Sequence, residues 1–212
     1  MPVLNSDIYI HEFRLYEALG QRKKRQNRLK SNKNRLKIPN RTSIDKRPAE
    51  IEGRDIFGHW EGDTISGTLA SGYLVTVVER KTRFLASGSM KDKRAETCNR
   101  ALSEAFADIS NSCIKSITFD NGLEFYYHEN LKELFECDTF FANPYSPWQR
   151  GSNENANRIL RRFFPKKINF SNLTQEDVDK AVHKINSMPR KSLRYYTPYE
   201  AFFDQQSVAL QT

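Results

Sequence analysis

Cysteine and histidine are scarce in this 212-residue sequence, which excludes two ways of stabilising a small domain. Its 3 cysteines are odd in number and show no C-x-x-C spacing, so neither a disulfide framework nor a structural zinc site is indicated. The 4 histidines are too widely scattered to predict a zinc site. We therefore expect Cys98, Cys113 and Cys137 to be small, buried, apolar residues.

Long apolar segments are also missing. Residues 1–17 lack the apolar region of roughly 7 to 15 residues that a signal peptide requires. No run of about 18 apolar residues is present to span a membrane. The sequence therefore predicts a cytoplasmic protein that does not act at a membrane.

Three acidic residues lie in local patterns that could bring their carboxylates together. Asp63 opens an alternating stretch and Asp120 ends an apolar run, so both are expected at strand positions. Glu154 comes 34 positions after Asp120, where loop residues give way to a helical pattern. Phosphodiester cleavage develops charge on several oxygens together, and two Mg²⁺ or Mn²⁺ ions held by such carboxylates can neutralise it. For Asp63 alone, a turn or capping role stays open.

Hydrophobic periodicity predicts a single α/β domain. The element order is that of a ribonuclease-H-like fold, with a mixed five-stranded sheet flanked by helices. In this fold, carboxylates from the first and fourth strands converge with one from a later helix. The expected strands are 61–66, 73–80, 84–89, 114–119 and 138–142, and the expected helices are 92–107, 124–135, one containing Glu154, and 173–188 capped by Thr174 with Asp177 three positions on.

Longer motifs surround the three acids. They are GHWEGD at 58–63, VERKTR at 78–83, TFDNGLEF at 118–125, NPYSPWQRGSNEN at 143–155, LRRFFPK at 160–166, and PRK at 189–191 with TPYE at 197–200. In order and spacing, over roughly residues 40–205, the chain resembles the DDE transposases of the IS-thirty insertion-sequence family, whose catalytic core is like that of retroviral integrases.

The resemblance implies that Asp63, Asp120 and Glu154 are the catalytic and metal-binding triad. It implies metal-dependent strand cleavage and strand transfer in DNA transposition. The expected partners are transposon ends, target DNA and further copies of the chain in synapsis. One departure is Met188, where the family usually has an arginine; this bears on a DNA or structural contact and not on the triad.

The alternatives concern activity. The sequence before the basic segment has no room for the helix-turn-helix with which this family recognises transposon ends. A truncated transposase fragment that acts as a non-catalytic DNA-binding inhibitor or regulator, or has no activity, is therefore the alternative. A host nuclease of ribonuclease-H type is a third hypothesis, which the transposase-like flanking motifs disfavour.

Positive charge is concentrated in the first quarter of the chain. Of the 34 Lys and Arg and the 26 Asp and Glu, 14 and 6 lie in residues 1–54, which leaves 20 of each in residues 55–212. We expect a basic, partly disordered arm or linker at 1–54, the catalytic core at 55–205 and a tail at 206–212. A basic run is otherwise only a solvated surface, but beside this core it favours binding to DNA phosphates. The residues of the arm assigned to DNA are Arg22, Lys23, Lys24, Arg25, Arg28 and Lys30.

A second basic row is expected on the helix that contains Glu154. Arg158, Arg161 and Arg162 are spaced three and four residues apart along it, and Lys166 follows its end. Such a row can lie along a phosphate backbone beside the active site.

Several residues near the triad are candidates for a supporting role, and most of them have an alternative interpretation. His59, four residues before the first acid, is predicted to support the metal ligands from outside. Asn121 and Asn155, each directly after an acid, either orient ligands and substrate or serve turn geometry. Trp60 and Trp148 are predicted to pack in the core, with base stacking as the alternative.

Overall fold

The computed structural model describes residues 37–68 and 71–209. Residues 37–54, which the sequence places in the arm, pack on the core: Ile44 and Ile51 are each 5% exposed, and Ser43 forms a parallel bridge with Phe141. The assignment of the arm to DNA stays a prediction, because its residues lie outside the described ranges. These are Arg22, Lys23, Lys24, Arg25, Arg28 and Lys30.

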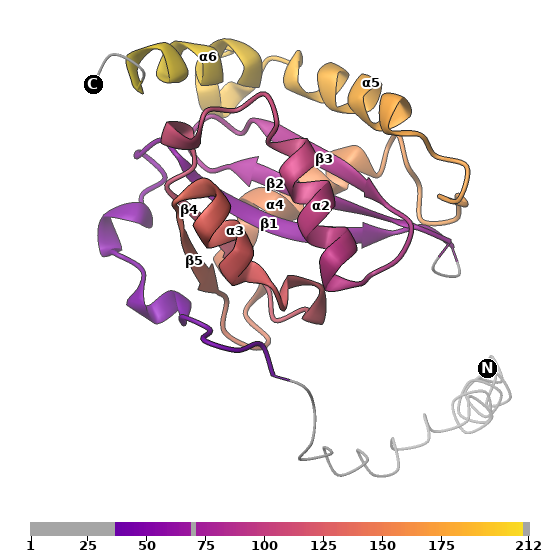
Figure 1. Ribbon diagram of the computed structural model, residues 1–212. Helices are drawn as coiled ribbons and strands as arrows, with labels where there is room; N and C mark the ends of the chain where they lie inside the picture. The colour runs from indigo at the N-terminus through magenta and orange to yellow at the C-terminus, as the bar shows by residue number, and fades with distance from the viewer. Residues whose placement is uncertain (1–36, 69–70, 210–212) are drawn as a thin grey trace, which may run out of the picture. The chain divides into compact units, whose positions relative to one another are not determined.

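Five strands form one mixed sheet: β1 (His59–Ser66), β2 (Tyr73–Glu79), β3 (Leu85–Met90), β4 (Ser116–Phe119) and β5 (Asp138–Phe141). Their order across the sheet is β3-β2-β1-β4-β5 (Figure 1). The first three strands are antiparallel neighbours, whereas β4 pairs parallel with β1 and β5 pairs parallel with β4. The predicted meander and the mixed five-stranded sheet are confirmed.

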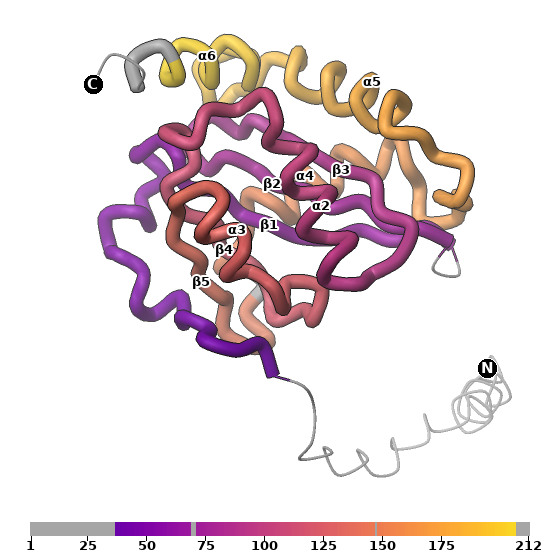
Figure 2. The backbone as a smooth tube through the Cα atoms, in the orientation of Figure 1, coloured from indigo at the N-terminus to yellow at the C-terminus, as the bar shows by residue number. Residues whose placement is uncertain are grey.

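Helices cover both faces of the sheet (Figures 1 and 2). On one face lie α2 (Ala95–Ala105) and α3 (His128–Phe135), and on the other lie α4 (Gly151–Leu160) and α5 (Gln175–Asn186). The predicted helix 124–135 is divided, because its first turn is a separate 3₁₀ helix. The 3₁₀ helices that lie wholly within the described residues are η1 (Ile44–Lys46), η2 (Ala49–Ile51), η4 (Asn111–Cys113), η5 (Leu123–Phe125), η6 (Pro147–Arg150) and η7 (Lys191–Leu193).

Strand β2 shows why the sheet needs two helical layers. Successive residues of a strand point to opposite faces. Val75 and Val77 join the core under α2 and α3, whereas Leu74 and Val78 join the core under α4 and α5. All four are at most 1% exposed. A strand that is apolar on both sides is stable only where both sides are covered.

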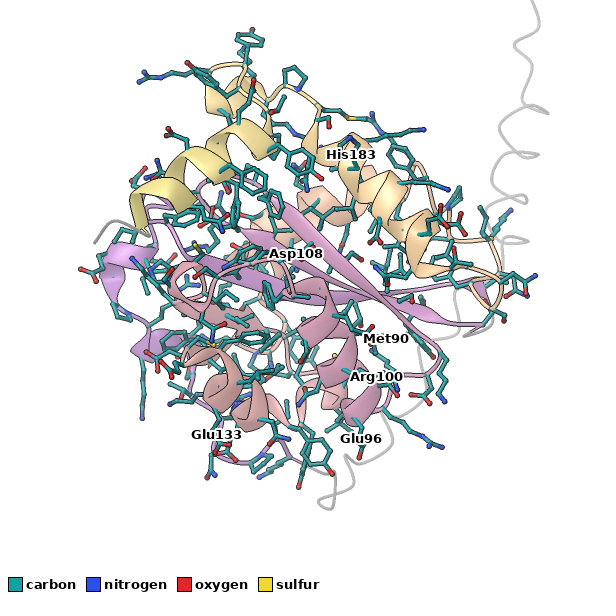
Figure 3. All side chains as sticks on the ribbon, turned by 45° about the horizontal axis from the view of Figure 1, so that its top comes forward. Met90, Glu96, Arg100, Asp108, Glu133 and His183 are labelled. Carbon is teal, nitrogen blue, oxygen red and sulfur yellow. The ribbon has the colours of Figure 1, made fainter. Side chains whose placement is uncertain are left out.

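Of the two C-terminal helices, α5 was predicted from the sequence and the other was not. Helix α5 begins at the predicted cap, where Thr174 Oγ1 accepts from Asp177 N at 3.2 Å. Helix α6 (Pro198–Ala209) was not predicted; its Phe202 is 1% exposed and joins the core on the α2 side. His183 of α5, labelled in Figure 3, has its Nδ1 3.1 Å from the hydroxyl of Tyr199 and so connects the two helices.

The two tryptophans differ from each other. Trp60 is fully buried and its Nε1 donates to Cys113 O at 2.9 Å, which confirms its core role. Trp148 is 71% exposed, so the prediction that it packs in the core is wrong. It lies in η6, in the connection between β5 and α4.

The three cysteines are free and buried, as expected. Burial raises the pKa of the Cys98 thiol, which keeps it protonated at neutral pH. Within the described ranges, no helix combines the length and the apolar character that crossing a membrane requires.

Candidate active site

Asp63 lies on β1, and Asp120 directly follows the neighbouring parallel strand β4. The paired residues of β1 and β4 end at Glu61 beside Thr118, so each aspartate comes two residues after this last pair. One arginine, Arg150, contacts both carboxylates. Their side chains are 25% and 35% exposed, so both carboxylates are partly accessible.

Gly62 allows these two strands to approach closely. A Cβ atom at this position would lie 2.5 Å from Cε1 of Phe119, which is far inside contact distance. Phe119 is itself 0% exposed and stacks on Phe125, with ring centroids 4.3 Å apart. The glycine therefore leaves room for a buried ring directly below the two carboxylates.

Arg150 bridges the two aspartates. Its Nη1 lies 3.4 Å from Asp63 Oδ1 and its Nη2 lies 3.6 Å from Asp120 Oδ2. Nη1 also donates to Gly62 O at 3.1 Å, whereas the buried Nε has no hydrogen-bond partner. The guanidinium neutralises charge that the pair of carboxylates would otherwise leave unbalanced.

The electrostatic environment of Asp120 is unfavourable for its charged form. Burial raises the pKa of this carboxyl above its usual range, and the charges of Asp63 and Glu124 raise it further. Arg150 and a hydrogen bond from Gly122 N, at 2.8 Å to Oδ1, act in the opposite direction. Another cation at this site would favour the ionised carboxylate.

Asp63 is oriented by two hydrogen bonds. Its Oδ1 accepts from Thr64 N at 2.8 Å, and its Oδ2 accepts from Asn157 Nδ2 at 3.0 Å. Asn157 is held in turn by Thr76, whose hydroxyl lies 2.9 Å from Asn157 Oδ1. Helix α4 is therefore connected directly to the carboxylate on β1.

Glu61 fixes the beginning of α4 against the sheet. Its Oε2 accepts from Ser152 N at 2.9 Å and from Asn153 N at 3.0 Å, two amides that have no partner inside the helix. Its Oε1 accepts from Arg80 Nε at 2.9 Å, and both charged side chains are almost fully buried. A carboxylate at a helix N-terminus is also favoured by the helix dipole.

Glu154 lies on the first turn of α4 and is exposed. It precedes Asn157 by three residues, so it occupies the same side of the helix as the residue that contacts Asp63. With Asn157, Arg158 and Lys166 it lines an open pocket of about 690 Å³. Among the described residues, however, no three His, Cys, Asp or Glu side chains are grouped closely enough to hold a metal ion. The structure brings two of the three predicted acids together and places the third nearby.

His59 is not near the carboxylates. Four residues along a strand span about 13 Å, although four residues along a helix would be neighbours. The ring of His59 is buried, and its Nδ1 is 2.8 Å from Ser116 Oγ at the start of β4. Burial, with nearby positive charge, lowers the pKa of His59 to about 4, so it is neutral at pH 7.

The two asparagines differ in their surroundings. Asn121 connects the ends of β4 and β5, because its Nδ2 donates to Ala142 O at 2.7 Å and its Oδ1 accepts from Arg41. It lines a pocket of about 360 Å³ with Asp120. Asn155 is exposed and accepts from Arg158 at 2.8 Å.

Of the predicted basic row, only Arg158 lies on α4, because the helix ends at Leu160 and Arg161 is its C-cap. Arg161 Nη1 donates to Ser66 O at 3.0 Å, and its guanidinium lies 6.0 Å from the centroid of the Phe170 ring. It thus holds the end of β1 as well as presenting charge. Arg158, Arg162 and Lys166 are exposed.

Comparisons with known proteins connect this geometry with transposases. The chain is 37% identical, over 171 residues, to the transposase InsI for insertion sequence element IS30A of Escherichia coli (strain K12), and the match covers 81% of this chain and 44% of that protein. It is 37% identical, over 175 residues, to the transposase for insertion sequence element IS4351 of Bacteroides fragilis, with 81% and 53% covered. The chain is a homologue of the IS30-family transposases. It spans about half the length of the curated relatives it matches.

The solved structures show the fold of this IS30-family homologue. The catalytic core domain of BIV integrase superimposes with a TM-score of 0.56 at 18% sequence identity, covering 72% of this chain and 98% of that domain. The predicted ribonuclease-H-like, integrase-type fold is thereby confirmed. No protein-family model matches the chain.

Sequence reasoning missed three polar residues at the site of this IS30-family homologue. Arg150 and Asn157 contact the aspartates, and Glu124 is a buried carboxylate that accepts from Thr64 Oγ1 and pairs with Lys93 Nζ, both at 2.8 Å. All three lie inside or just beyond the quoted motifs around the acids. That position was the only available signal, because each contact joins residues far apart in the sequence.

Proposed function

We propose that this chain carries the catalytic core of a DDE transposase, which cleaves DNA and joins it to a target. The observation that carries the proposal is the pair Asp63, on β1, and Asp120, directly after the parallel strand β4, with the cationic Arg150 side chain in contact with both carboxylates. Asp63, Asp120 and Glu154 are assigned as the catalytic triad. The names and the sequence similarity of the transposase relatives support the proposed activity.

The residues present fit divalent metal ions, on which transposases and integrases in general depend. The two neighbouring carboxylates offer hard oxygen donors, and they already hold a cationic guanidinium between them. Asp63 and Asp120 would bind Mg²⁺ or Mn²⁺, with Glu154 completing a second site. Bound ions would neutralise the charge that develops on the oxygens of the reacting phosphodiester.

The residues around the two aspartates hold their carboxylates in position. Asn157 and the amide of Thr64 hold Asp63, and the amide of Gly122 holds Asp120. In cleavage, a water oxygen bonds to phosphorus as the bond from phosphorus to the 3′ oxygen breaks, which leaves a 3′ hydroxyl. In strand transfer, the oxygen of that hydroxyl bonds to a phosphorus of the target DNA as the bond from this phosphorus to its own 3′ oxygen breaks; the displaced 3′ oxygen takes up a proton and leaves as a hydroxyl. Phosphoryl transfer of this kind depends chiefly on placement and charge neutralisation.

DNA is the proposed partner, in the form of transposon ends and target. The exposed Arg158 and Lys166, which line one pocket with Glu154, and the exposed Arg162 would contact its phosphates, together with the basic arm. Joining two ends requires a homo-oligomer in synapsis, and we place the reaction in the cytoplasm.

The test is nicking of supercoiled plasmid with Mn²⁺ by the wild type and by Asp120→Asn. The substitution keeps the shape of the side chain and removes the charge that binds metal. The matched control is Asp138→Asn, an exposed aspartate of β5 that pairs with Lys132 at 3.6 Å, away from the site. We expect nicking to be lost in Asp120→Asn and without metal, and kept in Asp138→Asn. Full nicking by Asp120→Asn would refute the mechanism, and DNA binding without nicking by the wild type would favour a non-catalytic DNA-binding regulator.

A further inference from the structure

Arg150 occupies the space that the proposed function requires for a cation. Its two terminal nitrogens contact one oxygen each of Asp63 and Asp120. The side chain is 15% exposed, so it reaches back from the surface into the site. A guanidinium and a divalent ion cannot both lie between the same two carboxylates, because each would repel the other at contact distance.

The hydrogen bonds and ion pairs of the site satisfy the Arg150 side chain only in part. Its contacts with the carboxylates, at 3.4 and 3.6 Å, are longer than a charge-assisted hydrogen bond of about 2.7 to 2.9 Å. Its Nε is buried without any acceptor. One donor is therefore unsatisfied in this position, and a ligand with a better arrangement of acceptors would draw the side chain away.

A DNA phosphate is such a ligand, and it can reach this side chain. Arg150 ends η6, whose Trp148 is 71% exposed, and it lines the open pocket of about 360 Å³ with Asp120 and the 88% exposed Tyr145. Phosphate oxygens accept two parallel hydrogen bonds from one guanidinium. An incoming DNA backbone at this rim would therefore compete directly with the carboxylates for Arg150.

We propose that Arg150 is a positioning residue that occupies the cation site in the absence of DNA and moves to a DNA phosphate when substrate binds, so that DNA binding and metal loading are coupled. This inference rests on the proposed function. Because Arg150 would compete with metal ions for the two carboxylates, metal affinity would be weak and cleavage slow until DNA binds. By thermodynamic linkage, Mn²⁺ should strengthen DNA binding by the same factor by which DNA strengthens Mn²⁺ binding.

The experiment is calorimetric titration of Mn²⁺ into the full chain, with and without a short DNA duplex, for the wild type and Arg150→Gln. In the wild type we expect DNA to tighten Mn²⁺ binding by a factor within the usual coupling range of roughly 5 to 150. In Arg150→Gln we expect Mn²⁺ binding without DNA to be about tenfold tighter than in the wild type, and the additional effect of DNA to be largely lost. Equal Mn²⁺ affinity of the two proteins without DNA, or equal coupling, would overturn the proposal.

Two further variants separate the possible causes. Arg100→Gln removes the same charge from α2, away from the carboxylates, since the exposed Arg100 pairs with Glu104 at 3.9 Å. If it tightens Mn²⁺ binding as much as Arg150→Gln does, the effect is one of net charge and the proposal fails. Asp120→Asn should abolish Mn²⁺ binding at this site. If it does not, the proposed function itself fails, whereas a loss in Asp120→Asn with no change in Arg150→Gln refutes only the role of Arg150. Circular dichroism of each variant establishes that it is folded.

Discussion

The substitution Glu61→Gln tests whether α4 is held by a buried charge. Gln keeps the size of the side chain but replaces one carboxylate oxygen with an NH₂ donor. That donor must face either Arg80 Nε or the amides of Ser152 and Asn153, all of which are donors as well. Either orientation leaves buried groups unsatisfied. Arg80, 2% exposed at its side chain, also loses the buried charge that it pairs with, Glu61 being 0% exposed.

Breaking a buried ion pair by changing one partner costs about 3 to 5 kcal/mol. Because a domain is stable by only about 5 to 15 kcal/mol, the loss should lower the urea midpoint strongly with little change in the slope. Equilibrium urea unfolding followed by circular dichroism measures it. Glu104→Gln is the control: this exposed residue pairs with Arg100 at 3.9 Å, and its loss should cost less than about 1 kcal/mol. Equal midpoints for the two variants would show that Glu61 does not anchor the helix.

Three further predictions concern single side chains. The pKa of His59 is about 4 in the folded state, whereas its ordinary value is 6.5. Between pH 4 and pH 6.5, therefore, the His59 side chain binds a proton only in the unfolded chain. The contribution of His59 to the free energy of unfolding is complete above pH 6.5 and falls by about 3 kcal/mol as the pH is lowered to 4. His59→Asn should remove this part of the pH dependence in urea titrations, and an unchanged difference between pH 7 and pH 4 would contradict it. Asn157→Ala should reduce the rate of Mn²⁺-dependent nicking about 10- to 100-fold, since supports of ligating side chains have effects of this size; a wild-type rate would exclude such a role. Trp148→Ala should change the free energy of unfolding by less than about 0.5 kcal/mol, because the ring is 71% exposed, and a larger loss in thermal or urea unfolding would mean that the ring packs on the core.

Most of the fold follows from sequence periodicity and turn residues. Strand β2 and helix α5 agree closely with prediction, because each has a strong apolar pattern and clear boundaries. Helix α6 was missed because its apolar residues do not form one regular face: Phe202 is buried while its neighbour Phe203 is 53% exposed. Its stability comes from a long-range ring contact, since Phe202 stacks on Phe84 with centroids 4.2 Å apart.

The site was predictable only in part. The strand positions of Asp63 and Asp120 followed from local pattern, and the parallel pairing of β1 and β4 brings them together. Arg150 and Asn157 were not predictable, because their contacts depend on how η6 and α4 lie across the sheet. His59 was misplaced because distance along the sequence was treated as distance in space without regard to the extended strand.

Gly62 has no side chain, and this bears on the distance between the carboxylates of Asp63 and Asp120. Any larger residue there would meet the ring of Phe119, so this buried ring, β1 or both would have to shift. Because these residues directly precede Asp120 and Asp63, such a shift would change the distance between the two carboxylates, although neither had been altered. The chemistry tolerates far less movement than the fold does, so a laboratory selection for activity should retain glycine at this position as strictly as it retains the acids, while a selection for solubility alone should let it vary.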